Sequence, residues 1–302
     1  MAQPTAKYHC LVTAFGPFYR YDEDHNPAWL AVAPLTNSII EDEQNNVRPI
    51  HVSTLQIPVS YQSVMDIVPL LHQHPPVFHP SIADQAAHNH VARPQKGYDF
   101  ILHVGVAGRG PLRVERVAHK FGYNMKDIYG RQAPVVETAP VAVEPDDPGD
   151  VPAGVLHIAP PQGESQQIEL ADPPEPAPIE PIRPKRGFGP SYENFQEEVY
   201  SDVNINNLIR NMKQQGFEDV YLSMDAGHYL PDFIYYCSLA EVIRSVKPYE
   251  RRRGTQVLVV HVPPVGQPLT SEEVTTALKL IITWVCSELQ SIDDTLAKER
   301  FQ

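Results

Sequence analysis

The residues of greatest chemical interest lie in the segment 220–246, VYLSMDAGHYLPDFIYYCSLAEVIRSV. Its first five residues suit a short buried strand, and the apolar spacing after Leu230 changes to that of a helix. Gly227 permits a sharp turn between the two, and Pro231 suits the first helical position because its missing N–H needs no partner there. Free amides at a helix start lower the pKa of a thiol and stabilise an oxyanion. The turn predicts the position of a nucleophile, yet the residue there is a proline.

No neighbouring side chain is an obvious replacement for that nucleophile. Cys237 lies six residues further along the predicted helix, about 9 Å along the axis and about 240° around it. Asp232 is a poor acyl acceptor, and Ser223 precedes the turn. His261 could supply a base, because it ends the apolar segment QVLVVHV before two prolines and can project into a crevice at the end of a strand. A structural histidine is the alternative interpretation.

The run DAGHYLPDFIYYCSLAEV resembles the strand, turn and helix of pyroglutamyl peptidase type I, whose pattern Ala-Gly-x-Tyr-x-Cys-Asn/Asp supplies a catalytic cysteine. Pro231 stands at the position of that cysteine. Three further stretches resemble the family in the same order, namely LVTAFGPFYRYDEDHNPAW, HVGVAGRGPLRVERVAH and VLVVHVPP. The run AHKFGYNMKDIYGR lacks the arginine that bacterial members keep near Met125, and so resembles the longer fungal members.

This resemblance implies a cysteine-type omega peptidase that removes N-terminal pyroglutamyl residues from peptides without a cofactor or a metal. It assigns the general base to His261 and the residue that orients it to Glu115, which would fix the imidazole tautomer. Without the resemblance, the alternative interpretation is that Glu115 forms a surface salt bridge. In the substrate site, the resemblance implicates Phe15 and Phe18 against the pyrrolidone ring. The same two residues could instead be ordinary core.

Val106 stands where many relatives carry glutamine. The contact that the resemblance implies at this position uses backbone groups, so the substitution need not abolish binding.

Composition restricts the classes of partner. The formal charge of −13 argues against binding to nucleic acid or to an anionic membrane, since both require a basic face. The first residues lack the apolar run of a signal peptide, and no stretch approaches the ~18 apolar residues of a membrane span. Three cysteines without metal-ligand spacing fit free thiols in a reducing compartment. We therefore expect a soluble, cytoplasmic protein, and the oligomeric state stays open.

Alternation of strands and helices predicts one α/β domain over residues 1–302, a three-layer αβα sandwich with a mostly parallel sheet. Strands are expected at 8–13, 50–57, 98–104, 112–118, 220–224 and 256–262. Helices are expected at 27–32, 61–71, 203–214, from about 230, and after the capping box that Thr270 and Glu273 form.

Two insertions interrupt this pattern. Residues 72–96 form a predicted His/Pro-rich loop, in which a solvated loop is favoured over a metal site because no cysteine or well-spaced carboxylate completes the ligands. Residues 134–182 carry ten acidic residues, twelve prolines and no Lys or Arg, so we expect disorder. The basic cluster of Arg183, Lys185 and Arg186 could neutralise that acidic insertion or act as a nuclear signal.

Three hypotheses about function follow. The chain is a peptidase homologue impaired by Pro231, or a catalytically inactive relative, a pseudoenzyme, that binds pyroglutamyl peptides or protein partners. A third hypothesis makes the acidic insertion an interaction tether on an idle domain. Proline has no nucleophilic side chain, and acyl transfer through a covalent intermediate needs one.

Overall fold

The structure is a computed structural model that describes residues 7–19, 21–22, 24–42, 46–137, 184–245 and 253–299. The described residues form one large central sheet of seven strands. In spatial order these are β10 (Val220–Ser223), β5 (Leu112–Glu115), β11 (Gln256–Val262), β4 (Phe100–Val106), β1 (Tyr8–Phe15), β3 (Val47–Ile57) and β2 (Ser38–Asp42). The α/β fold predicted from the sequence is confirmed.

Most neighbouring strands in this sheet are parallel. β1 pairs in parallel with β3 and β4, β4 with β11, and β5 with β10. Antiparallel pairing occurs between β11 and β5 and between β2 and β3. Because β1, β4 and β11 run in the same direction, their carboxyl ends meet at one edge of the sheet, where open α/β sheets bind ligands.

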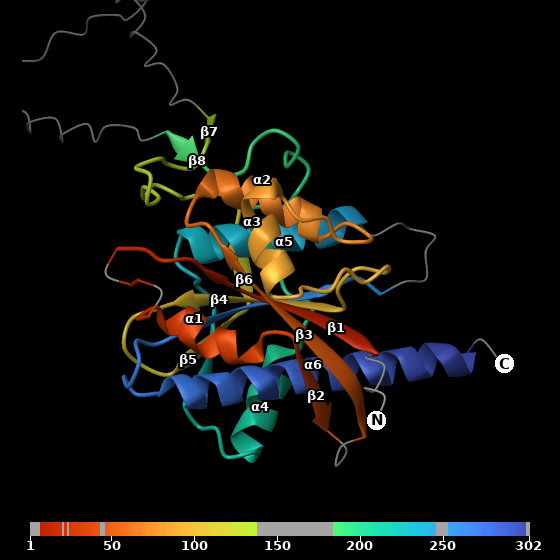
Figure 1. Ribbon diagram of the computed structural model, residues 1–302. Helices are drawn as coiled ribbons and strands as arrows, with labels where there is room; N and C mark the ends of the chain where they lie inside the picture. The colour runs from red at the N-terminus through yellow and green to blue at the C-terminus, as the bar shows by residue number, and fades with distance from the viewer. Residues whose placement is uncertain are drawn as a thin grey trace, which may run out of the picture.

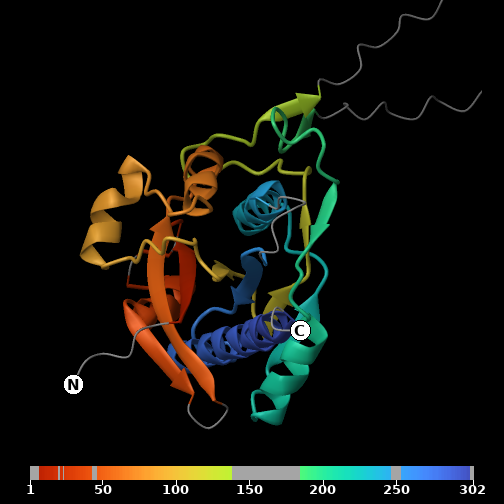
Figure 2. The same ribbon diagram turned by 90° about the vertical axis from the view of Figure 1, so that its right-hand side faces the viewer.

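Helices cover both faces of the sheet (Figures 1 and 2). One face carries α1 (Pro27–Val32), the short 3₁₀ helix η1 (Ala33–Leu35), α4 (Ile205–Gln214) and α6 (Ser271–Glu299). The other carries α2 (Tyr61–Leu71), α3 (Pro80–His88) and α5 (Leu230–Ser245). Each layer has its own hydrophobic core against the sheet, which explains why the central strands are apolar on both sides. None of the described helices combines the length and apolar content that crossing a bilayer requires.

One predicted strand is wrong, because residues 112–118 form two strands. β5 ends at Glu115, and β6 (Val117–His119) pairs in a separate sheet with β9 (Glu198–Tyr200). The change of partner occurs at Arg116, whose N–H donates to Ser223 while its carbonyl accepts from Ser201. The exposed Arg116 side chain separates the buried residues of β5 from those of β6, so this apolar segment contributes a strand to each of two sheets.

The loop predicted for residues 72–96 is also wrong in part, because it contains α3. His79 caps this helix by accepting a backbone N–H, and Pro80 occupies its first turn, where a missing N–H has no cost. Ile82 and Ala86 lie one helical turn apart and are buried in the core beside α2. Pro80 is typical of a helix start, whereas histidine is not among the usual capping residues, so the composition of the segment obscured this helix.

The acidic insertion lies mostly outside the described residues, which resume at 184. Its first residues form β7 (Val135–Glu137), which pairs with β8 (Lys185–Arg186). Both described members of the basic cluster contact the fold itself. The Lys185 Nζ lies 3.3 Å from a Glu197 carboxylate oxygen, and Arg186 donates to the carbonyl of Ala133 at 2.9 Å.

Candidate active site

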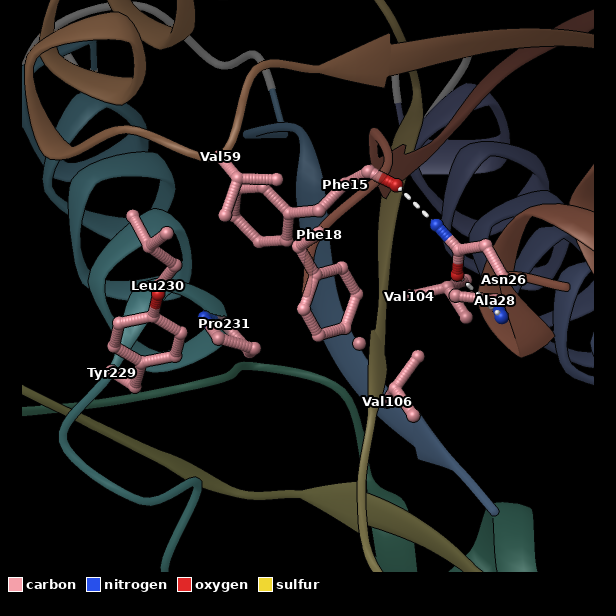
Figure 3. A pocket seen from close by; sticks show the side chains of 11 residues that line it. Phe15, Phe18, Asn26, Ala28, Val59, Val104, Val106, Tyr229, Leu230 and Pro231 are labelled. Atoms are coloured by element: carbon pink, nitrogen blue, oxygen red, sulfur yellow. Dashed lines mark hydrogen bonds between the residues drawn. The ribbon is translucent and has the colours of Figure 1, made fainter. Parts of the chain in front are cut away.

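A pocket opens at the carboxyl edge of the sheet, where β1, β4 and the start of α5 converge (Figure 3). It encloses about 370 Å³ of empty space, part of which is open to solvent. Its lining is largely apolar and consists of Phe15, Phe18, Asn26, Ala28, Val59, Val104, Gly105, Val106, Tyr229, Leu230 and Pro231. The predicted substrate-binding residues Phe15, Phe18 and Val106 all lie in this one pocket.

The aromatic wall of the pocket is held in place by the cap of α1. Phe15 ends β1 and is buried, and Phe18 is half-buried in the loop that follows. Asn26 donates from Nδ2 to the carbonyl of Phe15 at 2.9 Å, and its Oδ1 accepts the N–H of Ala28 at 3.2 Å. One buried amide thus caps the helix and fixes the end of the strand. Phe15 is also part of the core beside α2, so it serves the core and the pocket together.

Val106 forms the opposite wall, at the end of β4. It pairs with Val262 of β11, and the next residue, Ala107, donates its N–H to the Val262 carbonyl at 2.9 Å. The Val106 side chain is partly buried and apolar, so it adds surface to the pocket and no hydrogen bond.

His261 and Glu115 form a buried pair beside this pocket. Nδ1 of His261 lies 2.8 Å from Oε1 of Glu115, and the two side chains are 7% and 0% exposed. The antiparallel register of β11 and β5 sets Val259 opposite Glu115, which brings His261 within reach on the same face. An ionised carboxylate can accept a hydrogen bond from the Nδ1–H, which fixes the tautomer in which the neutral imidazole has its lone pair on Nε2. The structure therefore brings together the two residues to which the resemblance assigned the roles of base and orienter.

Gly105 shows how close His261 lies to Pro231. A Cβ at position 105 would lie 3.0 Å from His261 Nε2 and 3.0 Å from Pro231 Cβ. The basic nitrogen and the Pro231 side chain therefore approach the same point of the backbone from two elements. Only a glycine leaves room for both, because 3.0 Å is well inside ordinary carbon contact of about 3.5–4.0 Å.

Pro231 occupies the first turn of α5 and faces the pocket, as Figure 3 shows together with Tyr229 and Leu230. The turn before it has Gly227 at φ +70°, a conformation that favours glycine, and its N–H donates to Asp225 at 2.8 Å. The predicted strand, turn and helix are therefore present. The side chain at this turn is the saturated ring of Pro231, which cannot attack a carbonyl.

Cys237 does not approach the pocket. Its side chain is fully buried in the hydrophobic core on the α5 side of the sheet, and its Sγ lies 3.5 Å from the Tyr192 hydroxyl. Burial raises the pKa of the Cys237 thiol to about 12, so at neutral pH it is protonated and a weak nucleophile. Cys10 and Cys286 are also buried and free.

Two features of this region were missed in the sequence. Asn26 was not singled out, although an Asn before a Pro at a helix start is a readable capping signal. The second feature is a cluster of His119, His228 and Asp232 behind the first turn of α5. His228 and Asp232 are only four residues apart, but His119 lies more than a hundred residues before them, and no local spacing signals that it meets them.

Comparison with known proteins connects this geometry to a family. Pyroglutamyl-peptidase 1 of Rattus norvegicus is 24% identical to this chain over 294 residues, which span 95% of this chain and 94% of the relative. The human protein of the same name is 24% identical over 279 residues, or 90% and 87% of the two chains. The chain resembles pyroglutamyl peptidase I along nearly its whole length. No family model matches it.

Solved structures share the fold. Pyroglutamyl peptidase I of Bacillus amyloliquefaciens has a TM-score of 0.54 and 18% identity, covering 93% of this chain and 98% of its own. A mutant pyrrolidone carboxyl peptidase of Pyrococcus furiosus has a TM-score of 0.52 and 19% identity, with coverages of 93% and 98%. The resemblance to pyroglutamyl peptidase I stated from the sequence motifs is thereby confirmed.

Proposed function

We propose that this protein binds N-terminal pyroglutamyl peptides in the pocket beside Pro231 and is impaired in cleaving them. The observation that carries the proposal is the contact around Gly105. A Cβ placed on Gly105 would lie 3.0 Å from Nε2 of His261 and 3.0 Å from Cβ of Pro231, so both side chains border the same small space. A base that is buried, oriented by Glu115 and aimed at the nucleophile position is the arrangement of a covalent peptidase that lacks its nucleophile.

The pocket supports the binding half of the proposal. A pyrrolidone ring is small and flat, and the lining offers two phenylalanines on one side and Val106 on the other. The predominantly apolar lining is typical of small-molecule sites.

The chemistry supports the impaired half. His261 can remove a proton only from a group that carries one, and proline at position 231 offers none. When a nucleophile is removed from a triad, the remaining groups typically still give about 10³–10⁴-fold acceleration over water. Trace hydrolysis is therefore expected, far below that of an intact cysteine peptidase.

The second candidate function is that of an inactive binding protein, and Pro231 is again the residue that favours it. In this alternative the chain has no hydrolytic role and recognises pyroglutamyl peptides or a protein partner through the intact pocket. The proposal further includes one domain that carries the site, a cytoplasmic location, and neither nucleic acid nor membrane as a partner. The formal charge of −13 supports the last two exclusions.

A fluorogenic pyroglutamyl amide tests the proposal. The wild type should release at most a trace of fluorophore, and Pro231→Cys should restore part of the activity. Restoration should be partial, because Val106 and the region of Met125 depart from the bacterial pattern. Adding His261→Ala or Glu115→Gln to Pro231→Cys should abolish or sharply reduce the gain, since each removes the base or its orientation.

Binding is measured separately from turnover. Calorimetry with 2-pyrrolidone should detect an interaction with the wild type that is weakened by Phe18→Ala, because the half-buried Phe18 lines the pocket. If the wild type cleaved the substrate rapidly and thiol reagents did not inhibit it, the proposal that its peptidase activity is impaired would be wrong. A Pro231→Cys variant that binds 2-pyrrolidone but releases no fluorophore would favour the hypothesis that the protein is an inactive binder.

A further inference from the structure

Three potential metal ligands meet on the side of α5 that faces β6. His119 ends β6, His228 lies in the turn before α5, and Asp232 lies in the first turn of that helix. Oδ2 of Asp232 lies 3.1 Å from Nδ1 of His119 and 3.6 Å from Nδ1 of His228. One ligand atom from each residue lies within 4.8 Å of the other two. Within the described ranges, these are the only three such residues grouped this closely.

These spacings suit a single cation. A tetrahedral zinc site with bonds of about 2.0–2.1 Å places its ligand atoms about 3.3 Å apart. The two measured distances from Asp232 lie on either side of that value. The two rings are inclined at 62° with centroids 4.7 Å apart, so they converge from different directions.

Neighbouring groups already hold the ligands in position. Oδ1 of Asp232 accepts the backbone N–H of His119 at 3.1 Å, and the buried Tyr123 hydroxyl contacts both the His119 carbonyl oxygen and, at 3.2 Å, Oδ2 of Asp232. The His228 ring lies against Gly122, where an added Cβ would be 2.9 Å from its Nδ1. Gly122 has φ +104° and gives the ring its space. Contacts of this kind orient metal ligands and raise affinity.

The cluster is accessible from one side. The side chain of Asp232 is fully buried, that of His119 is 18% exposed and that of His228 is 48% exposed. A cation can therefore enter from the His228 side, and three protein ligands leave a coordination position toward solvent. Zinc sites with three protein ligands and an open position hold water or a further ligand there.

We propose that His119, His228 and Asp232 bind a divalent transition metal ion of the Zn²⁺ or Co²⁺ type, with one position open to solvent. Two imidazoles and one carboxylate favour these ions over Ca²⁺ and Mg²⁺, which prefer oxygen ligands. None of the three residues lines the pocket, so the site is separate from it. The ion links the turn before α5 to β6 and stabilises the turn that presents Pro231. This inference does not depend on the proposed peptidase reaction.

The test is calorimetry with Zn²⁺ alone on the full chain, together with the visible absorption of the Co²⁺ complex. The wild type should bind one ion with a saturable transition. His228→Gln should weaken binding at least tenfold, because even loss of a group that only orients a ligand typically costs about 10–100-fold. His228 is half-exposed, so this variant should fold. His119→Gln is the second variant and should weaken binding to the same extent.

The matched control is the double variant His88→Gln/His90→Gln, which removes two exposed histidines outside the cluster. It should bind Zn²⁺ like the wild type, and Zn²⁺ should raise the melting temperature of both but not of His228→Gln. Failure of the wild type to bind Zn²⁺ would overturn the proposal. Equal affinity of His228→Gln and wild type would do the same, as would loss of binding in the control.

Discussion

Replacing Gly105 by alanine tests how closely His261 and Pro231 approach each other. The added methyl group would lie 2.9 Å from His261 Cδ2, 3.0 Å from its Nε2 and 3.0 Å from Pro231 Cβ. Ordinary contacts for such atoms are about 3.5–4.0 Å, so the imidazole, the start of α5, or both must move by a few tenths of an ångström. His261 is held by the buried hydrogen bond to Glu115 and has little freedom to yield.

The expected cost follows from two opposing terms. Overpacking of a buried site costs about 1–3 kcal/mol. Restricting the unfolded chain by replacing glycine with alanine returns about 0.4–1 kcal/mol. We therefore expect Gly105→Ala to lower the free energy of unfolding by about 1–2 kcal/mol. In the Pro231→Cys protein the same change should also lower kcat, because it displaces the base from the nucleophile.

Urea unfolding followed by tryptophan fluorescence measures the stability change. Gly108→Ala is the matched control, because it lies in the turn after β4 and an added Cβ there meets no atom within 4 Å. The control should be neutral or slightly stabilising. If Gly105→Ala were no less stable than Gly108→Ala, the base and the nucleophile position would not be as close as the structure places them.

The remaining predictions concern buried groups. Burial, and secondarily the charge of His74, lowers the pKa of His72 from 6.5 to about 3. As the pH falls below 6.5 the unfolded chain takes up this proton first. The stability that depends on His72 should therefore be complete above pH 6.5 and fall by up to about 1.4 kcal/mol per pH unit toward pH 3, and His72→Gln should flatten that dependence in urea titrations. Asn26→Ala removes a buried helix cap and should lower the free energy of unfolding by about 1–3 kcal/mol, whereas Asn204→Ala, at an exposed cap, should lower it by about 1 kcal/mol. Equal losses would contradict the second hydrogen bond of Asn26, to the carbonyl of Phe15. Cys237 and the other native thiols should resist a thiol-specific dye until the chain unfolds, whereas Pro231→Cys should add one fast-reacting thiol; rapid labelling of the folded wild type would be the contrary result.

Much of the fold could be predicted because local patterns determine it. The predicted limits of α1, α2 and β11 agree with the structure to the residue. In each, a cap or a proline marks an end and the apolar period has one interpretation. The capping box at the start of α6 is also present, with Thr270 and Glu273 exchanging hydrogen bonds at 2.7 and 3.2 Å. Where local signals were ambiguous, as in α3, composition was misleading.

The candidate site divides in a similar way. The sequence by itself determined which side chains the site can contain, including the proline at position 231, because the identity of a residue does not depend on the fold. It also placed Pro231 and His261 at element ends, which the carboxyl edge of a parallel sheet brings together.

Only the tertiary structure decided how those ends meet. The register of β11 against β5 and β4 puts His261 beside Glu115 on one side and Gly105 on the other. The break at Arg116 turns the chain so that His119 reaches Asp232. Both outcomes depend on pairing between segments that are far apart in the chain. Residue spacing does not determine that pairing, because side chains along a strand alternate between two faces, and a shift of two residues keeps the same faces in another register.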